Sequence, residues 1–411
     1  MKQHQYSVLY SFTGYADGSW PRGGVIEDAS GAFYGTTQLG GSSHTCVPYN
    51  KATCGTVFKL TPSPSGYTES VVHSFTGRRS DGADPMAGLI LGEDGALYGT
   101  TSSDDRGNGC GTLFELTPSA SGYMESTIYT FPNPRAGRGA PPCEPEAGLI
   151  LRGGTLYGTT LFGGRRGEGS AFKLRLAGRH EARTMHQFAD DYGVWPFAGL
   201  TFGKDGALYG TTSLGGSYNR GVVFKLTPRE KARYAETVLV NFGDFKGTSP
   251  YGGVIFDNAG ALYGTTAYGG TGTCRGTLSG CGTVFKLTPL GSGYVHKTLY
   301  SFRGYSHSDG SSPYGNLIFD KSGALYGMTS GGGKPWCNCG TVFKLTPSGS
   351  GYEESILHRF GGARPGDEPQ GGSGDGGGAQ GGLILGKDGA LYGTALHGGT
   401  YGEGMVFRIV P

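Results

Sequence analysis

Short runs of alternating hydrophobic and polar residues recur along the whole chain, separated by turns rich in glycine, proline and aspartate. The first run, Tyr6–Phe12, alternates and contains mainly β-branched and aromatic residues, which predicts a strand. The next runs, in chain order, are 23–27, 32–37, 55–61 and 67–75. No segment shows a convincing helical periodicity, so the pattern predicts an all-β protein.

A seven-residue motif dominates these runs. It reads GALYGTT at Gly95 and occurs seven times with small changes, ending as GALYGMT at Gly323 and GALYGTA at Gly389. Its tyrosines are Tyr34, Tyr98, Tyr157, Tyr209, Tyr263, Tyr326 and Tyr392, which gives repeats of 52 to 66 residues. A repeat of this length is typical of a solenoid, a propeller or an array.

Each repeat contains four predicted strands in the same order, which we name A (GGVIED type, 23–27), B (ALYGTT, 32–37), C (GTVFKLT, 55–61) and D (ESVLYSF type, 67–75). Seven four-stranded antiparallel units predict a seven-bladed β-propeller. The small residues of strand A suit the crowded inner position, and strands C and D suit the rim. An open solenoid would need polar capping repeats, and neither end has one. We therefore expect residues 1–411 to form one domain, and a monomer.

The two ends of the chain predict how the ring closes. The chain begins with a D strand, Tyr6–Phe12, and ends with a C strand at 404–409. If the N-terminal strand pairs with the C-terminal blade, no strand edge stays exposed.

The units GTVFKLTPSGSGYEESILHRF and PYGGVIFDNAGALYGTT resemble the glycine-rich tandem repeat of the GloVer type, and the resemblance covers essentially the whole chain. It implies an exported, propeller-like bacterial surface protein, and it implies no catalytic residues. The chain departs from that pattern because its start shows no signal-peptide core and no anchor is evident. The third repeat is also degenerate, since residues 172–179 replace FKLTPSxSGY.

Composition narrows the partners. The 82 glycines follow the repeat, which excludes collagen, and aromatic residues at 12% argue against disorder. Charged residues make up 16%, the net charge is +2 and no basic stripe is present, so we expect no nucleic-acid partner. No apolar run is long enough for a membrane helix. Nothing in the sequence indicates a cofactor.

The loops divide into two kinds. The A–B and C–D connections are repetitive turns on one face, here called the turn face. The B–C and D–A connections vary in length and type on the opposite face, here called the loop face. A rigid scaffold with variable loops usually carries function on those loops. The glycine-rich segment Gly361–Gly381 is predicted to be a flexible loop with little fixed structure.

All eight cysteines map to the loop face. Their register and spacing predict the disulfides Cys46–Cys54, Cys274–Cys281 and Cys110–Cys143, and leave open whether Cys337 and Cys339 are bridged across one residue. The alternative is a set of thiols or a metal site, but zinc-type spacing is missing, so no metal is expected. Disulfides indicate an extracellular or periplasmic location.

Candidate ligand-binding residues also map to the loop face. Aromatic rings with polar tips suit the flat faces of sugars, although the Trp-Pro pairs could instead fix the loops. Charged residues that break the repeat could act on a substrate or could simply be solvated. The candidates are Trp20, Trp195, Trp336, Tyr218, Arg165, Arg166, Glu168 and His307. The strand-D histidines His73, His186 and His358 are expected to be packing residues, not ligands.

These observations favour a secreted or surface-exposed binding propeller that recognises a glycan or another extracellular ligand. One alternative is a polysaccharide lyase or glycoside hydrolase that uses a carboxylate pair on the same face, with catalytic residues unknown. Another is a structural or adhesive surface protein without a small ligand.

Overall fold

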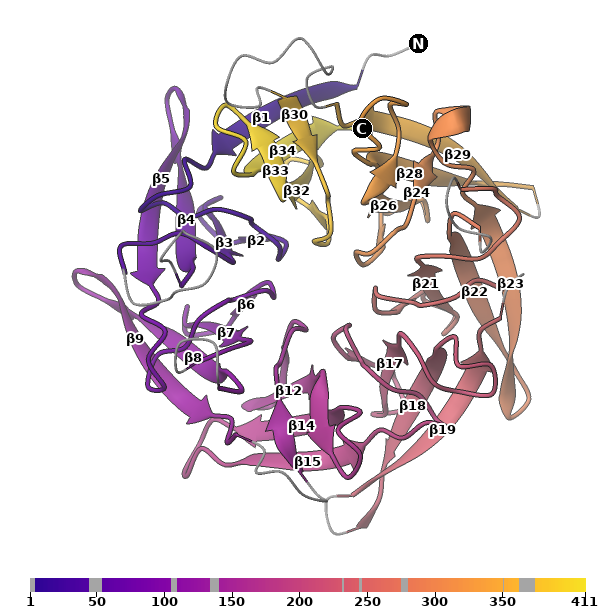
Figure 1. The fold of residues 1–411 in the computed structure, drawn as a ribbon, viewed down its shortest axis with the longest axis horizontal. Coiled ribbons are helices and arrows are strands. Elements are labelled where there is room, and N and C mark those ends of the chain that lie inside the picture. Colours follow the sequence, from indigo (N-terminus) through magenta and orange to yellow (C-terminus); the bar gives the residue numbers. More distant parts are fainter. Residues whose placement is uncertain are drawn as a thin grey trace.

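The computed structural model describes residues 4–43, 54–104, 109–133, 140–230, 233–243, 246–274, 280–349, 351–361 and 374–411. Seven four-stranded antiparallel sheets surround a central opening, as Figure 1 shows. The described residues contain no α-helix. The predicted seven-bladed propeller is therefore confirmed, with strand A nearest the axis in every blade (Figure 1).

The strands of the first four blades run from the axis outward. Blade one is β2 (Ile26–Glu27), β3 (Phe33–Thr37), β4 (Thr56–Ser63) and β5 (Gly66–Ser74), and blade two is β6 (Ile90–Leu91), β7 (Leu97–Thr101), β8 (Thr112–Ser119) and β9 (Gly122–Thr130). Blade three is β11 (Ile150–Arg152), β12 (Thr155–Thr160), β14 (Ser170–Arg175) and β15 (Ala182–Gln187), and blade four is β16 (Thr201–Phe202), β17 (Leu208–Thr212), β18 (Val222–Pro228) and β19 (Tyr234–Asn241).

The remaining blades repeat this order. Blade five is β20 (Ile255–Phe256), β21 (Leu262–Thr266), β22 (Thr283–Leu290) and β23 (Gly293–Ser301), and blade six is β25 (Ile318–Phe319), β26 (Leu325–Thr329), β28 (Thr341–Ser348) and β29 (Gly351–Arg359). Blade seven is β31 (Ile384–Leu385), β32 (Leu391–Ala395), β34 (Met405–Val410) and β1 (Gln5–Ser11). Shorter elements in the loops are β10 (Ala140–Cys143), β13 (Phe162–Gly164), β24 (Gly310–Ser311), β27 (Gly331–Gly332), β30 (Gly374–Gly377), β33 (His397–Gly399) and the 3-10 helix η3 (Tyr305–His307).

Blade seven closes the ring with strands from both ends of the chain. Strand β1 pairs antiparallel with β34, from Gln5 opposite Val410 to Ser11 opposite Met405. The Oγ1 of Thr394 in blade seven also donates to the carbonyl of Gly23 in blade one, at 2.9 Å. The predicted closure is therefore confirmed.

The glycine within LYGTT is required by close packing. A Cβ placed on Gly264 would lie 2.7 Å from Cζ of Phe285, the phenylalanine of strand C in the same blade. Real Cβ atoms do not approach so closely, and this phenylalanine is fully buried. The same glycine–phenylalanine contact occurs in every blade, which explains why the motif keeps Gly in all seven copies.

Paired hydroxyl groups explain the last threonine of the motif. In blade five the hydroxyls of Thr266 and Thr283 lie 2.8 Å apart and are buried. Blade seven has Ala395 and Met405 at these places, so both polar partners are replaced together. Replacing both leaves no buried hydroxyl unsatisfied, and such a change is nearly neutral.

The motif tyrosines belong to the core of each blade rather than to a ligand site. Tyr263 is buried, its hydroxyl donates to Asp257 of the A–B turn at 3.1 Å, and Nζ of Lys286 lies 5.0 Å from its ring centre. The same tyrosine–aspartate bond is present in four other blades, at Tyr34, Tyr209, Tyr326 and Tyr392.

The strand-D histidines pack as predicted and also pair with carboxylates. The ring of His73 lies 4.8 Å from that of Phe75, and its Nε2 is 2.7 Å from Oδ1 of Asp81. In blade seven the equivalent Tyr10 donates to Asp17 at 2.9 Å. The carboxylate comes from the following D–A loop, which the strand pattern does not reveal.

Two glutamates beside this network are buried without full hydrogen bonding. Burial raises the pKa of Glu69 and of Glu354 to about 7, with a smaller contribution from Asp17 and Asp309 respectively. Within the described residues, Oε1 of each glutamate has no hydrogen-bond partner. The folded-state pKa exceeds the unfolded value, so the stability contribution is present below pH 4.5 and is lost as pH rises through about 7.

We therefore expect Glu69→Gln and Glu354→Gln to raise the melting temperature at pH 8.5 by on the order of a few degrees, and to have little effect at pH 4.5. The exposed neighbour Glu353→Gln is the matched control. Scanning calorimetry at the two pH values measures the difference. An equal effect of the buried and exposed substitutions at pH 8.5 would contradict the explanation.

Candidate binding site at the channel mouth

The variable loops converge on one face because each D–A loop pairs with the B–C loop of its own blade. The pairs are Ser19 with Leu39, Ala83 with Ser103, β10 with β13, Val194 with Leu214, Thr248 with Tyr268, β24 with β27 and β30 with β33. The prediction of little fixed structure in Gly361–Gly381 therefore fails for Gly374–Gly377, which forms β30. Residues 362–373 of that segment lie outside the described residues.

After this pairing, each loop turns toward the axis through a residue with left-handed backbone. These residues are Trp20, Asp84, Glu144, Trp195, Ser249 and Ser312, with φ between 53° and 59°, and Gly378 in blade seven. A residue other than glycine in this region costs of order 1–3 kcal/mol and persists only where its surroundings fix it. The backbone is therefore held firmly at seven equivalent points.

Neighbouring blades supply that restraint. The N–H of Trp195 donates to the carbonyl of Glu168 in the preceding blade at 3.0 Å, and its own carbonyl accepts from the N–H of Ser213 at 3.1 Å. Trp20 makes the same two bonds, to Glu403 and from Gln38. Each loop is thus clamped between two blades before it enters strand A.

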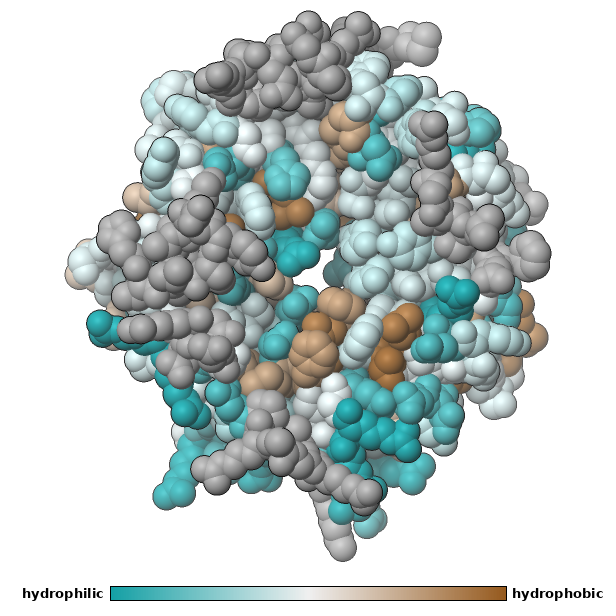
Figure 2. Space-filling view, in the orientation of Figure 1, coloured by the Kyte–Doolittle hydropathy of each residue, from teal (hydrophilic) through white to brown (hydrophobic). Residues whose placement is uncertain are grey.

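Two residues further on, seven side chains form a ring that we call the mouth ring. They line a cavity of about 250 Å³ where the loops meet strand A, and they are Arg22, Met86, Glu146, Phe197, Tyr251, Tyr314 and Gln380. Below the ring, the A strands of all seven blades line the channel. Figure 2 shows hydrophobic and hydrophilic surface side by side around the central opening.

Three successive blades give the mouth ring an aromatic arc. The ring centres of Phe197 and Tyr251 lie 5.1 Å apart, and those of Tyr251 and Tyr314 lie 4.5 Å apart and are stacked. Burial raises the pKa of both tyrosines, and the hydroxyl of Tyr268 contributes at Tyr314. Both hydroxyls therefore stay protonated at neutral pH and can donate hydrogen bonds.

The other side of the mouth ring is polar. Nε of Arg22 donates to Oε1 of Gln380 at 3.0 Å, and its Nη1 lies 3.3 Å from Sδ of Met86. Burial raises the pKa of Glu146, and the charge of Arg22 opposes the shift. The ring thus offers donors, acceptors and one flat apolar wall to a single ligand.

Sequence reasoning did not find this ring, although a signal exists. In six of the seven repeats the ring residue follows proline, and in all seven it precedes small residues, which are Gly or Ala and then Gly or Asn. The ring residue itself differs between nearly all copies. A position that varies inside a constant frame indicates recognition of a ligand without seven-fold symmetry.

Two of the predicted tryptophans adjoin the mouth ring. Trp20 and Trp195 occupy the left-handed positions two residues before Arg22 and Phe197. Their exposed fractions are 39% and 37%, and the Trp20 ring meets the edge of His397 at 6.0 Å. Trp336, from a B–C loop, instead lies 5.8 Å from Nζ of Lys334 and does not line the cavity.

The predicted charged residues of blade three lie in its B–C loop, not in the mouth ring. Nη1 of Arg166 forms an exposed ion pair with Asp190 at 2.7 Å, and Arg165 is exposed. The pKa of Glu168 is raised, first by burial and then by Asp190. These groups contact each other rather than the channel.

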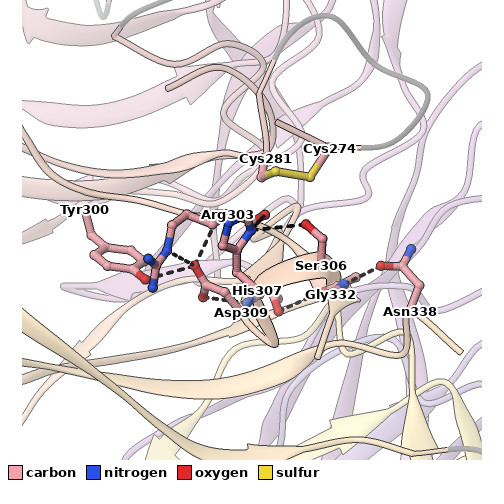
Figure 3. Close-up of a disulfide and its surroundings, with 12 residues drawn as sticks. Cys274, Cys281, Tyr300, Arg303, Ser306, His307, Asp309, Gly332 and Asn338 are labelled. Atoms are coloured by element: carbon pink, nitrogen blue, oxygen red, sulfur yellow. Dashed lines mark hydrogen bonds and ion pairs between the residues drawn. A yellow bond between two sulfur atoms is a disulfide. The ribbon is translucent and has the colours of Figure 1, made fainter. Parts of the chain in front are cut away.

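The remaining candidates, Tyr218 and His307, lie on other loops. Tyr218 is 67% exposed. Figure 3 shows His307 in η3, close to Ser306 and Arg303 and on the same side as the Cys274–Cys281 disulfide. Its Nδ1 is 3.1 Å from Oγ of Ser306 and 3.3 Å from the carbonyl of Arg303, so its side chain folds back on its own loop.

The predicted disulfides Cys110–Cys143 and Cys274–Cys281 are confirmed, and Cys337–Cys339 is also formed. Cys54 is disulfide-bonded, and its predicted partner Cys46 lies outside the described residues. These bonds indicate an oxidising location. Within the described chain, no helix is long and apolar enough to cross a membrane.

The disulfides also support the mouth ring. The carbonyls of Cys54, Cys110, Cys281 and Cys339 accept the N–H of the left-handed residue in the following blade, at 2.9–3.2 Å. In these four blades, the cysteine therefore fixes the strut from which the ring residue projects.

One group of described residues has the composition of a metal site. Ligand atoms of His73, Asp81 and Glu125 lie within 4.8 Å of one another. Both oxygens of Asp81 are already used, one by His73 and the other by the backbone and hydroxyl of Thr76. The same contact with tyrosine in place of histidine occurs at Tyr10, so we interpret this group as structural.

These features define a seven-bladed repeat propeller with a varied ring at one mouth of its channel. The model of the Gloeobacter/Verrucomicrobia repeat family matches residues 1–144, 138–279 and 272–411, so the chain belongs to that family. The family resemblance inferred from the repeat motifs is confirmed.

A comparison with curated proteins gave no match. Among solved structures, the chain is similar to a proposed 6-phosphogluconolactonase from Bacteroides uniformis, with 12% identity, a TM-score of 0.50 and coverage of 94% of this chain and 99% of that one. It is also similar to an ancestral GH74 enzyme, with 10% identity, a TM-score of 0.52 and coverage of 95% of this chain and 51% of that one. At such identities the likeness concerns the fold alone.

Proposed function

We propose that this protein is an extracellular or periplasmic binding propeller that holds a glycan at the mouth ring. The observation that carries the proposal is the division of the ring into a stacked aromatic arc, Phe197, Tyr251 and Tyr314, and a polar arc with Arg22 and Gln380. Sugars present an apolar face of C–H groups and a rim of hydroxyls, so they need both kinds of surface.

The size of the cavity limits the ligand. Drug-sized ligands occupy roughly 300–1,000 Å³, and the mouth cavity measures about 250 Å³. We therefore infer that one terminal sugar enters the ring while the rest of the chain lies over the loops near Trp20 and Trp195. Those tryptophans then serve as outer platforms.

Binding is favoured over hydrolysis by the carboxylates of the ring. Glycoside hydrolysis generally uses two carboxyl groups on either side of the bond that is cleaved. The mouth ring contains one, Glu146, and its pKa is raised by burial. A single buried acid beside Arg22 is better suited to accept or donate a hydrogen bond to a sugar hydroxyl.

A glycan array probed with the intact protein tests the proposal, and titration calorimetry with the best ligand follows. Tyr251→Ala is expected to weaken binding about fivefold, because one stacking contact contributes about 1 kcal/mol. Tyr15→Ala, which removes a 78% exposed ring on the same face, is the matched control and should bind normally. If no glycan binds, or if both variants bind equally, the proposed function is wrong.

A further inference from the structure

The degenerate third repeat creates a second cavity, on the turn face and away from the mouth ring. It measures about 580 Å³ and is lined by Thr155, Tyr157, Lys173, Arg175, Ala177, Arg179, Glu181 and Arg183. Four of these residues are cationic and one is anionic. The formal charge of the lining is therefore +3, compared with +2 for the whole chain.

Three of the cations lie on one face of the blade. Lys173 and Arg175 are two residues apart on β14, so their side chains point the same way. Arg183 on β15 is the direct cross-strand partner of Lys173. Like charges in direct opposition destabilise a sheet, so this arrangement is unfavourable unless an anion lies between them.

The other blades show that this arrangement is specific to blade three. The position of Arg175 is Thr in five blades and Val410 in blade seven, and that of Arg183 is Ser or Thr in five blades and Lys297 in blade five. Scaffold requirements at these sites are thus met by small polar residues. The arginines serve something other than the fold.

Blade three has also lost the carboxylate that balances its strand-C lysine. The equivalent cations Lys225, Lys286 and Arg408 pair with Asp205, Asp257 and Asp388 of the A–B turns, at 2.7, 3.7 and 2.6 Å. The A–B turn of blade three is Gly153-Gly154 and carries no acid. Lys173 instead lies 5.5 Å from the ring centre of Tyr234, and none of the four cations forms an ion pair with a described residue.

We propose that this cavity, here called the blade-three site, binds a small polyanion that carries at least two phosphate or sulfate groups. Two arginines and a lysine converge on it, and the planar guanidinium groups suit the paired oxygens of such anions. The cavity volume lies within the range of small-molecule sites. The hydroxyl of Thr155 and the ring of Tyr157 complete a wall that a sugar or nucleoside moiety could contact.

Titration calorimetry of the full chain in low-salt, phosphate-free buffer tests this site with two probes, pyrophosphate and sucrose octasulfate, and with neutral sucrose as a blank. The key variant is Arg175→Thr with Arg183→Ser, which restores the residues of the other blades and should fold normally. We expect wild-type protein to bind at least one anion, and the variant to bind it roughly 100-fold more weakly, about tenfold for each arginine. Lys297→Ser in blade five is the matched control and should bind like wild type.

Thermal melting provides an independent readout. Without ligand the double variant should melt at the same temperature as wild type or higher, because the repulsion is removed, and only wild type should gain stability from the anion. Binding of pyrophosphate alone identifies phosphate compounds, and binding of the octasulfate alone identifies sulfated saccharides. Absence of binding by both probes, or equal binding by wild type and the double variant, overturns the proposal.

Discussion

Removal of residues 1–12 is expected to unfold or aggregate the protein, or to lower its melting temperature by many degrees. The truncation deletes β1 and exposes the whole edge of β34, which would be free to pair with other chains. It also removes Phe12, which is fully buried against the ring of Phe58 at 5.0 Å. Losing one such phenylalanine side chain costs about 3–5 kcal/mol, a large part of a typical stability of about 5–15 kcal/mol.

The loss reaches the next blade as well. The ring of Tyr6 stacks on His358 of blade six at 3.8 Å, and its hydroxyl donates to the carbonyl of Asp375 at 2.9 Å. Deleting β1 therefore removes the cover from the joint between blades six and seven.

Calorimetry and size-exclusion chromatography measure the effect. Removal of residues 1–4, which precede β1, is the control and should leave the melting temperature unchanged. A synthetic peptide of residues 1–12 added to the truncated protein should restore much of the lost stability, since it can pair with β34. A truncated protein that stays monomeric and melts like wild type would show that the ring does not depend on this strand.

The scaffold could be predicted from the sequence because its determinants recur. LYGTT places a glycine against a strand-C phenylalanine in each blade, so the motif reports a packing rule that seven copies must obey. The chain ends predict closure because one unpaired D strand and one unpaired C strand remain. The cysteine pairs follow from a shared register before strand C.

The mouth ring could not be predicted by the same reasoning. Repeat comparison finds positions that stay constant, whereas the ring consists of residues that differ, such as Arg22, Glu146 and Phe197. It assembles only when residues up to 358 positions apart, Arg22 and Gln380, come into hydrogen-bond contact. The tryptophans attracted attention because they are rare, and two of them proved to lie beside the ring in sequence.

Simultaneous replacement of Phe197, Tyr251 and Tyr314 by alanine is expected to weaken glycan binding more than 100-fold. Each ring contributes about 1 kcal/mol of stacking and each tenfold in affinity corresponds to about 1.4 kcal/mol, so three rings account for about two orders of magnitude. Because their neighbouring rings lie only 4.5 and 5.1 Å apart, they form one continuous wall for the ligand. The change should appear in the dissociation constant measured by calorimetry, with melting checked in parallel.

Two further variants separate the contributions. Tyr251→Phe with Tyr314→Phe keeps the stacked wall and removes both hydroxyls, so it should retain most of the affinity if stacking dominates. Trp20→Ala with Trp195→Ala should weaken binding by about tenfold if the indoles act as outer platforms for a longer glycan, and should leave the binding of a single sugar unchanged. Wild-type affinity in the triple alanine variant would place the ligand outside the mouth ring. Early melting of the double tryptophan variant, with binding preserved, would instead assign the indoles to holding the left-handed loop segments in place.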